Sequence, residues 1–256
     1  MQSKKLIGYN INLGSYDSFI NTIISSTDAS AVPYYVCVAN VHMLMEAYKS
    51  ETFAQILNEA NLVTPDGKPI TWALKFLSGI TQPRVAGMDL LPDLLSVSAR
   101  QKIPVAFYGG SQAVLDKTAE QIKINYPDLI IGNMYSPPFR TLTAEEDQLV
   151  IDMINNSGAR LLFVVLGCPK QEKWMASMMG KIHAVMVGIG GALPVLVGMQ
   201  KRAPVWMQNA GLEWFYRFAQ EPKRLFKRYA VTNSLFIYLV MKEKYFSRHT
   251  KNNIRR

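Results

Sequence analysis

Short continuous runs of apolar residues recur along the chain, and each is followed by a polar or glycine-rich turn and then by an amphipathic stretch. Such runs are typical of strands buried on both faces of a sheet, whereas the stretches between them have the period and length of helices. The expected strands lie at 34–39, at the start of 61–77, and at 104–108, 129–132, 160–166 and 183–187. Their alternation with helices predicts right-handed crossovers and a doubly wound, mostly parallel sheet of the α/β class.

The remaining segments carry hairpin and helix signals. Residues 6–13 alternate imperfectly, which predicts an edge strand or a hairpin, and Ser15 or Asp17 can cap the helix that follows. Thr143 and Glu146 stand in capping-box spacing at the start of another helix. The helices expected along the chain end near residues 24, 49, 77, 125, 157 and 179.

The composition changes near Arg202. The chain has 256 residues, of which 49% are hydrophobic, so it can bury the core of one large domain. From residue 202 onward the sequence becomes basic and rich in aromatic residues. We therefore expect a Rossmann-like α/β core over 1–201 and a helical appendage over 202–256.

Net charge and cysteine content indicate which partners and which cellular compartment to expect. The formal net charge of +9 favours an anionic partner, which can be a nucleic acid, a phosphorylated substrate or an anionic membrane surface. Cys37 and Cys168 both lie in apolar runs, which indicates a reducing, cytoplasmic compartment rather than a disulfide framework. The N-terminus lacks the apolar segment of a signal peptide, and glycines and a proline interrupt the charge-free stretch 182–200. No transmembrane helix is expected.

An acidic turn, Asp66-Gly67, follows the strand at the start of 61–77. In parallel α/β sheets ligands bind beyond the carboxyl ends of the strands, so a carboxylate at this position is a candidate for chemistry. The alternative is that Asp66 serves only as a turn or helix-cap residue. Asn40 and His42 follow the preceding strand and fall on the same expected edge, although a lone histidine is more often structural than catalytic.

Further turns close the later strands. Gly109 and Gly110 precede a helix whose free N–H groups can receive a phosphate, but the same glycines can simply allow a tight turn. The motif is neither GxGxxG nor a Walker A loop. Gln171 and Glu172 begin the helix after Cys168. No base is evident that could activate Cys168 as a nucleophile.

Neither a metal nor a cofactor is expected. The chain contains no D-x-D pair of the kind that holds a metal on a nucleotide diphosphate. Its histidines, His42, His183 and His249, show no metal-ligand spacing. The absence of GxGxxG and of a following ribose-binding acid also argues against a dinucleotide oxidoreductase.

Arginines and aromatic residues are interleaved in the appendage. Arg217, Arg224 and Arg228 recur at spacings of seven and four, but Pro222 is expected to start a new helix, so only the last two are placed on one face. Such a segment suits the plane of an anionic membrane surface, where arginine can also bind a diphosphate. The alternatives are packing on the sheet, contact with a second subunit, or nucleic-acid binding.

Six motifs are distinctive when taken together: PDGKPI (65–70), RVAGMDL (84–90), GCPKQE (167–172), GIGG (188–191), KRAPVWMQNAGLEWFYRF (201–218) and EPKRLFKRY (221–229). They resemble the WecG/TagA/CpsF family of bacterial glycosyltransferases, glycosyltransferase family 26, over nearly the whole chain. The resemblance implies inverting, metal-independent transfer of a sugar from a UDP-sugar to a polyprenyl-diphosphate-linked acceptor. It also implies a peripheral location on the inner face of the cell membrane and a step in cell-surface polysaccharide synthesis.

The resemblance further implies roles for individual residues. Asp66 matches the proposed general base, which takes the proton from the acceptor hydroxyl. Arg217, Arg224 and Arg228 match appendage arginines that neutralise charge on the UDP β-phosphate or hold the lipid diphosphate. The residues expected to bind the substrate are Asn40, Gly67, Arg84, Gly109, Gly110, Gln171, Gly188, Gly190 and Gly191.

One departure from the family pattern concerns the donor. Many members have Phe-Asp after the second glycine loop, where this chain has Leu193-Pro194. The change removes a second pocket carboxylate, so N-acetylmannosamine, its uronic acid and glucose all stay open as donor sugars. The abundance of apolar residues also leaves a homo-oligomer open.

Overall fold

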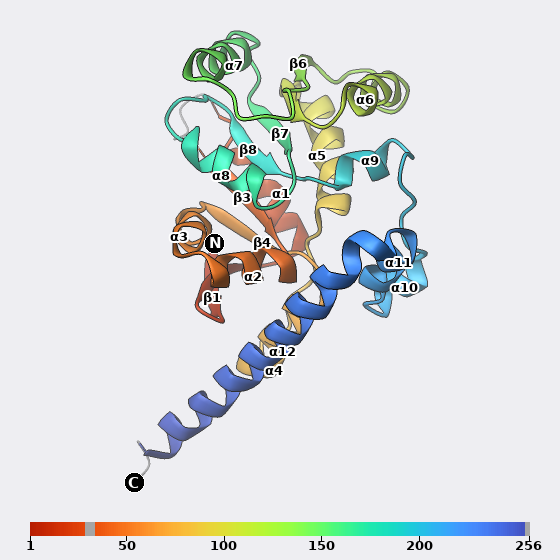
Figure 1. The fold of residues 1–256 in the computed structure, drawn as a ribbon. Coiled ribbons are helices and arrows are strands. Elements are labelled where there is room, and N and C mark those ends of the chain that lie inside the picture. Colours follow the sequence, from red (N-terminus) through yellow and green to blue (C-terminus); the bar gives the residue numbers. More distant parts are fainter. Residues whose placement is uncertain (29–33, 254–256) are drawn as a thin grey trace.

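A six-stranded parallel sheet forms the centre of the molecule (Figure 1). The computed structural model describes the backbone of residues 1–28 and 34–253, and the side chains in these ranges except those of residues 224, 227, 228 and 247–253. The strands are β3 (Tyr34–Ala39), β4 (Leu62–Pro65), β5 (Val105–Gly109), β6 (Ile131–Tyr135), β7 (Leu161–Val165) and β8 (Val185–Gly188), in the order β4-β3-β8-β7-β5-β6. Every neighbouring pair is parallel, which confirms the predicted α/β class.

Helices surround this sheet, and a separate hairpin precedes it. The hairpin consists of β1 (Gln2–Leu6) and β2 (Tyr9–Leu13), which pair antiparallel as predicted. The helices described are α1 (Tyr16–Ser25), α2 (Val41–Lys49), α3 (Glu51–Glu59), α4 (Lys68–Ser78), α5 (Gly87–Gln101), α6 (Gln112–Asn125), α7 (Ala144–Asn156), α8 (Lys170–Ser177), α9 (Ala192–Leu196), α10 (Val205–Asn209), α11 (Glu213–Gln220) and α12 (Pro222–Asn253).

Local signals placed most helix ends correctly. Ser15 caps α1, and Thr143 with Glu146 forms a complete capping box on α7. The strand expected at 129–132 was misplaced by two to three residues, since β6 spans Ile131–Tyr135. β6 contains Gly132 and Asn133, so no continuous apolar run marks it, and its position is set by pairing with β5. Helices α3 and α5 were not predicted; α5 contains an internal proline, Pro92, which weakens a helix signal.

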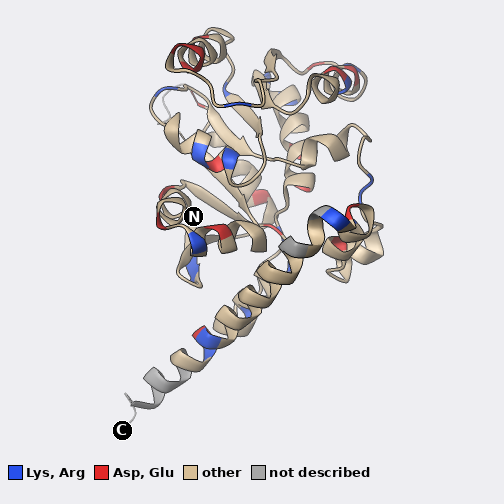
Figure 2. Ribbon diagram, viewed as in Figure 1, with Lys and Arg blue, Asp and Glu red and all other residues tan. Residues whose placement is uncertain are grey.

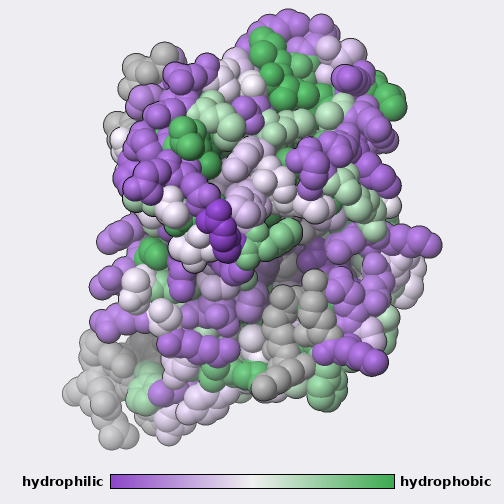
Figure 3. Space-filling model, turned by 45° about the horizontal axis from the view of Figure 1, so that its top comes forward, coloured by the Kyte–Doolittle hydropathy of each residue, from purple (hydrophilic) through white to green (hydrophobic). Residues whose placement is uncertain are grey.

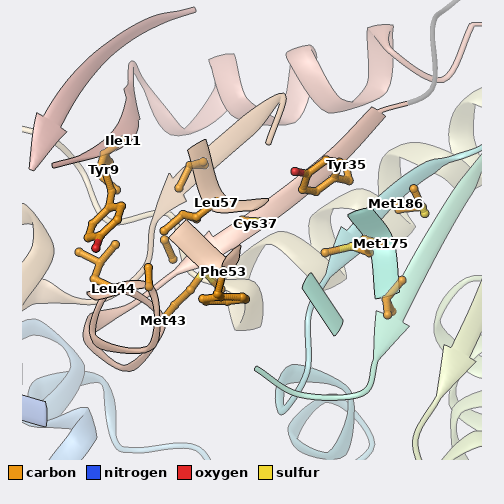
Figure 4. Close-up of a cluster of buried hydrophobic side chains, with 14 of the residues drawn as sticks. Tyr9, Ile11, Tyr35, Cys37, Met43, Leu44, Phe53, Leu57, Met175 and Met186 are labelled. Atoms are coloured by element: carbon orange, nitrogen blue, oxygen red, sulfur yellow. The ribbon is translucent and has the colours of Figure 1, made fainter. Parts of the chain in front are cut away.

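Alternate residues of each strand enter two separate cores. On one face of the sheet Tyr35 and Cys37 pack with α2, α3 and α8, and Figure 4 shows this cluster. On the other face Val36 and Val38 pack with α1, α5 and α6. Burial on both faces explains why the strands read as continuous apolar runs instead of alternating with polar residues.

The last helix, α12, belongs partly to the first core. It begins at Pro222 as predicted, and its buried side chains Phe236, Leu239 and Val240 join the same cluster as α2. Figure 1 shows α12 lying beside α4 before it extends away from the sheet. Within the described ranges, no helix combines the length and the apolar character needed to cross a membrane.

Candidate active site

Asn40 and Asp66 stand side by side at the carboxyl edge of the sheet. β3 and β4 are parallel neighbours with Ala39 opposite Pro65, and the Asp66 N–H donates to the Ala39 carbonyl at 2.8 Å. The Asn40 side chain accepts from the Met43 N–H at 3.2 Å and so caps α2. Two residues from different βα turns are thereby fixed next to each other.

The turn after Asp66 leaves its carboxylate available. Gly67 has φ +98°, a backbone conformation that glycine adopts without strain, and it lets the chain turn from β4 directly into α4. Within the described part of the chain, the Asp66 carboxylate accepts no hydrogen bond, from α4 or from elsewhere. The structure therefore gives no support to Asp66 as a helix cap.

The surroundings of Asp66 favour its protonated form. Burial raises the pKa of this carboxyl to about 7, and the nearby charge of Glu213 acts in the same direction. Arg217 and Arg84 oppose the shift, whereas Asp89 adds to it. A carboxyl with a pKa near neutrality is suited to accept a proton as a general base.

An arginine from the core and a glutamate from the appendage meet beside Asp66. Arg84 contacts Glu213 of α11 with one terminal nitrogen, and its Nη2 lies 3.0 Å from Asp89 Oδ2. Asp89 also pairs with Arg202. Burial lowers the pKa of Arg84, but Glu213, Asp89 and Asp66 outweigh it and leave that pKa raised.

Sequence reasoning missed two of these groups. Asp89 lies in the quoted RVAGMDL motif and Glu213 in KRAPVWMQNAGLEWFYRF, but neither received a role. The available signal for Glu213 was that it is the single acidic residue within residues 201–218 of an otherwise basic segment. Its partner, Arg84, is evident only in the folded structure, where α11 lies against the core.

The predicted appendage arginines divide into two groups. Arg217 is exposed, its Nη2 lies 3.7 Å from Met88 Sδ, and its charge acts on Asp66. Arg224 and Arg228 lie on the backbone of α12, but their side chains fall outside the described residues. Among the residues coloured in Figure 2, Lys and Arg lie on the core, on the segment that precedes α10, and on α12.

Gln171 lies beneath the second glycine loop, with its amide bonded inside the protein. Its Nε2 donates to Glu172 Oε1 at 2.7 Å, and its Oε1 accepts from the Gly167 N–H at 3.2 Å. A Cβ at Gly188 would lie 2.8 Å from Gln171 Nε2, and one at Gly190 would lie 3.2 Å from Gln171 Oε1. Gln171 thus supports the loop around residues 188–190, and its contact with a sugar stays a prediction.

Cys168 is not set up as a nucleophile. Burial, followed by the charge of Glu172, raises the pKa of its thiol, and this disfavours the reactive thiolate. Glu172 is itself fully buried, and burial raises its pKa to about 7. Among the side chains that the structure describes, no group of three His, Cys, Asp or Glu is arranged to hold a metal ion.

The first glycine turn is explained by close packing. Gly109 has φ +105°, and a Cβ there would lie 2.7 Å from the Val165 backbone, while the Gly110 N–H donates to the Val165 carbonyl at 2.9 Å. These contacts support the tight-turn interpretation of Gly109. Gly191, by contrast, meets nothing within 4 Å, so it leaves open space at the edge of the site.

The packing at Gly109 gives a first testable prediction. Gly109→Ala should destabilise the protein more than Gly158→Ala, because Gly158 also has positive φ but open space around it. The extra loss should be about 1–3 kcal/mol, the usual effect of overpacking. Urea unfolding of both variants measures it, and equal losses would show that the backbone conformation alone requires glycine at 109.

Comparisons with known proteins identify the family to which the chain belongs. A family model described as "Glycosyl transferase WecG/TagA/CpsF family" matches residues 4–250. One relative, from Bacillus subtilis (strain 168), is 30% identical over 216 residues, covering 84% of this chain and 81% of its own length. Another, from Bacillus spizizenii, is 31% identical over 213 residues, covering 83% and 80%. Both are named N-acetylglucosaminyldiphosphoundecaprenol N-acetyl-beta-D-mannosaminyltransferase.

Proposed function

Because the chain belongs to the WecG/TagA/CpsF family of glycosyl transferases, we propose that it transfers N-acetylmannosamine from a UDP-linked donor to N-acetylglucosaminyl-diphospho-polyprenol. The names of the two Bacillus relatives support this sugar and this acceptor. Among the three donor sugars left open by the sequence, they favour N-acetylmannosamine over its uronic acid and glucose. The observation that carries the proposal is the position of Asp66, which lies at the strand ends with Arg217 of the appendage close by.

Asp66 acts as the base in the proposed reaction. Its carboxylate takes the proton from an acceptor hydroxyl while the hydroxyl oxygen forms a bond to the anomeric carbon of the donor sugar. The bond between that carbon and the UDP β-phosphate oxygen breaks, and the configuration inverts because attack and departure occur on opposite faces. The raised pKa of Asp66 makes the carboxylate a stronger base than a solvated aspartate.

Arg217 provides positive charge for the leaving group. It is exposed, and within the described residues it forms no ion pair, so its guanidinium is free to contact the UDP β-phosphate. A guanidinium binds phosphate oxygens in a bidentate manner and stabilises the charge that grows on UDP. This role replaces the metal ion that other nucleotide-sugar transferases use, and the proposed reaction needs no added metal.

A membrane-facing surface is consistent with a lipid-linked acceptor. Large apolar side chains are exposed on α4 and α10–α12: Trp72, Phe76, Val205, Trp206, Trp214, Phe215, Phe226, Ile237, Tyr238, Met241, Tyr245 and Phe246. Lys244 joins two of these helices, because its Nζ lies 4.8 Å from the centre of the Phe76 ring. The face in Figure 3 is mostly hydrophilic, with green clusters separated from one another. The apolar surface of α4 and α10–α12 supports peripheral attachment to the inner face of the membrane.

A binding measurement and a transfer assay, both in the presence of EDTA, test the proposed function. In the first, UDP at 100 times its Kd should stabilise the protein by about 2.7 kcal/mol, whereas NADH and oligonucleotides should not. UDP-N-acetylmannosamine and a synthetic N-acetylglucosaminyl-diphospho-lipid should then give the lipid-linked disaccharide, identified by mass spectrometry. Product with only UDP-glucose or the uronic acid donor would overturn the sugar assignment, and loss of product with EDTA would overturn metal independence.

A further inference from the structure

Four charged side chains form a connected chain between the core and the appendage. Arg202 contacts Asp89, Asp89 contacts Arg84, and Arg84 contacts Glu213. The two negative charges balance the two positive charges. Arg84 and Glu213 are the least exposed of the four, with side-chain exposures of 13% and 19%. Removing one partner of a partly buried ion pair leaves the other charge poorly solvated, which is destabilising.

The core end of this chain is anchored to the strand that carries Asp66. The Val85 N–H donates to the Pro65 carbonyl at 3.0 Å, and Thr64 Oγ1 donates to the Val85 carbonyl at 3.0 Å. Arg84 immediately precedes Val85, so its backbone is fixed beside the end of β4. The position of its guanidinium relative to Asp66 is therefore set by the sheet.

Both terminal nitrogens of Arg84 are already used. Nη1 contacts Glu213 and Nη2 contacts Asp89, so the fork that a phosphate would occupy is filled by carboxylates. The other end of the chain lies on α11, where Glu213 and Arg217 are four residues apart and share one helix face. Fixing Glu213 consequently fixes Arg217 one turn later, where it contacts Met88.

We propose that Glu213 is a positioning residue that seats α11 on the core through Arg84 and thereby holds Arg217 beside Asp66. Arg84 then serves as the core half of this ion pair rather than as a diphosphate ligand. The inference rests on the proposed function for its effect on transfer, although the seating of α11 is a structural property by itself. It assigns the appendage a defined contact point with the core.

The same contact affects the proton affinity of the base. The charged groups that act on Asp66 are Glu213 and Asp89, which favour its protonated form, and Arg217 and Arg84, which favour its ionised form. Neutralising Glu213 removes one negative charge and leaves Arg84 less compensated. Both changes lower the pKa of Asp66.

The test compares Glu213→Gln with Glu120→Gln, which alters an exposed glutamate on α6 away from the site. Two readouts do not need activity: the titration of Asp66, followed by carbon-13 NMR of its carboxyl, and hydrogen exchange of the α11 amides. Glu213→Gln should accelerate hydrogen exchange in α11. It should also shift the Asp66 titration midpoint, because loss of the Glu213 charge lowers this pKa whereas movement of Arg217 away from Asp66 raises it. Transfer should fall by on the order of 10²-fold, the usual effect of a displacement of about 1 Å in an active site.

Unchanged α11 exchange in Glu213→Gln would overturn the inference, because loss of the Glu213 charge affects the Asp66 titration whether or not Glu213 seats α11. If Glu213→Gln does not fold, Asp89→Asn provides the second variant, since it removes the shared partner of Arg84 and Arg202 and should also accelerate exchange in α11. Failure of the wild-type protein to transfer sugar would defeat the proposed function alone. The exchange result would still decide whether Glu213 seats α11.

Discussion

Replacing Asp66 with asparagine is expected to reduce sugar transfer by about 10²- to 10⁴-fold, the range typical of a positioned general base. Asparagine has nearly the same shape but cannot accept the proton of the acceptor hydroxyl. The Asp66 carboxylate makes no hydrogen bond within the described residues, so the substitution breaks no contact of the fold. Binding of UDP should therefore persist, which a thermal-shift titration measures beside the transfer rate.

The same variant is expected to be more stable than the wild type at pH 8. Folding raises the pKa of Asp66 to about 7, above an unfolded value of about 3.9. The folded protein thus binds the proton more tightly than the unfolded chain, and the wild type loses stability as the pH rises from about 4 to about 7. The Asp66→Asn variant carries no such charge, so its advantage should be present at pH 8 and absent near pH 4.

Measuring the free energy of unfolding at pH 4 and at pH 8 distinguishes this pH-dependent gain from a general change in stability. Asp116→Asn, on the exposed surface of α6, is the matched control and should show no comparable pH-dependent gain. Wild-type transfer should rise with pH through about 7, because only the ionised carboxylate is a base. Full turnover in Asp66→Asn would remove Asp66 from the base role, whatever its stability.

Replacing Arg217 with glutamine is expected to lower kcat by about 10²- to 10³-fold, as does loss of a group that stabilises transition-state charge. Arg217 is exposed and is held near Asp66 by α11, so it is placed to contact UDP and contributes little to the core. Glutamine retains hydrogen-bonding capacity but lacks the positive charge. Arg217→Lys should recover part of the rate, because it restores the charge without the bidentate fork.

Initial rates of transfer measure this effect, and Arg100→Gln is the matched control. Arg100 lies exposed in the last turn of α5, where its loss should leave transfer unchanged. Removing Arg217 should also raise the pKa of Asp66, since Arg217 favours the ionised form. A kcat equal to the wild type would show that Arg217 does not act on the leaving group.

Several features of the site followed from local sequence. The apolar runs placed β3 and β4, so Asn40 and Asp66 were each expected just after a strand. Only the structure shows that these two strands are neighbours, with Ala39 opposite Pro65. The Asp-Gly turn after β4 is a property of a few adjacent residues. Local periodicity and turn chemistry carry this information because the interactions concerned span only a few residues.

Other features depended on how distant segments meet. The nearby Val165 backbone leaves no room for a side chain at Gly109. Hydrogen bonds with Gly167 and Glu172 hold the Gln171 amide inside the protein. The motifs alone reveal neither of these two contacts. The pKa of Asp66 depends on its burial and on four charged side chains brought from other parts of the chain.

The sequence by itself determined the parallel α/β fold and placed Asp66 at the carboxyl edge of the sheet, where we propose the site. The tertiary structure alone decided that Arg84 pairs with Glu213, 129 residues away, and that Arg217 is carried to Asp66 by the same helix. The physical reason is that hydrophobic period and turn residues act over a few positions, whereas a charge has no sequence pattern that identifies its partner. That partner is chosen when packing of α11 and α12 against the core brings the two charges together and shields them from water.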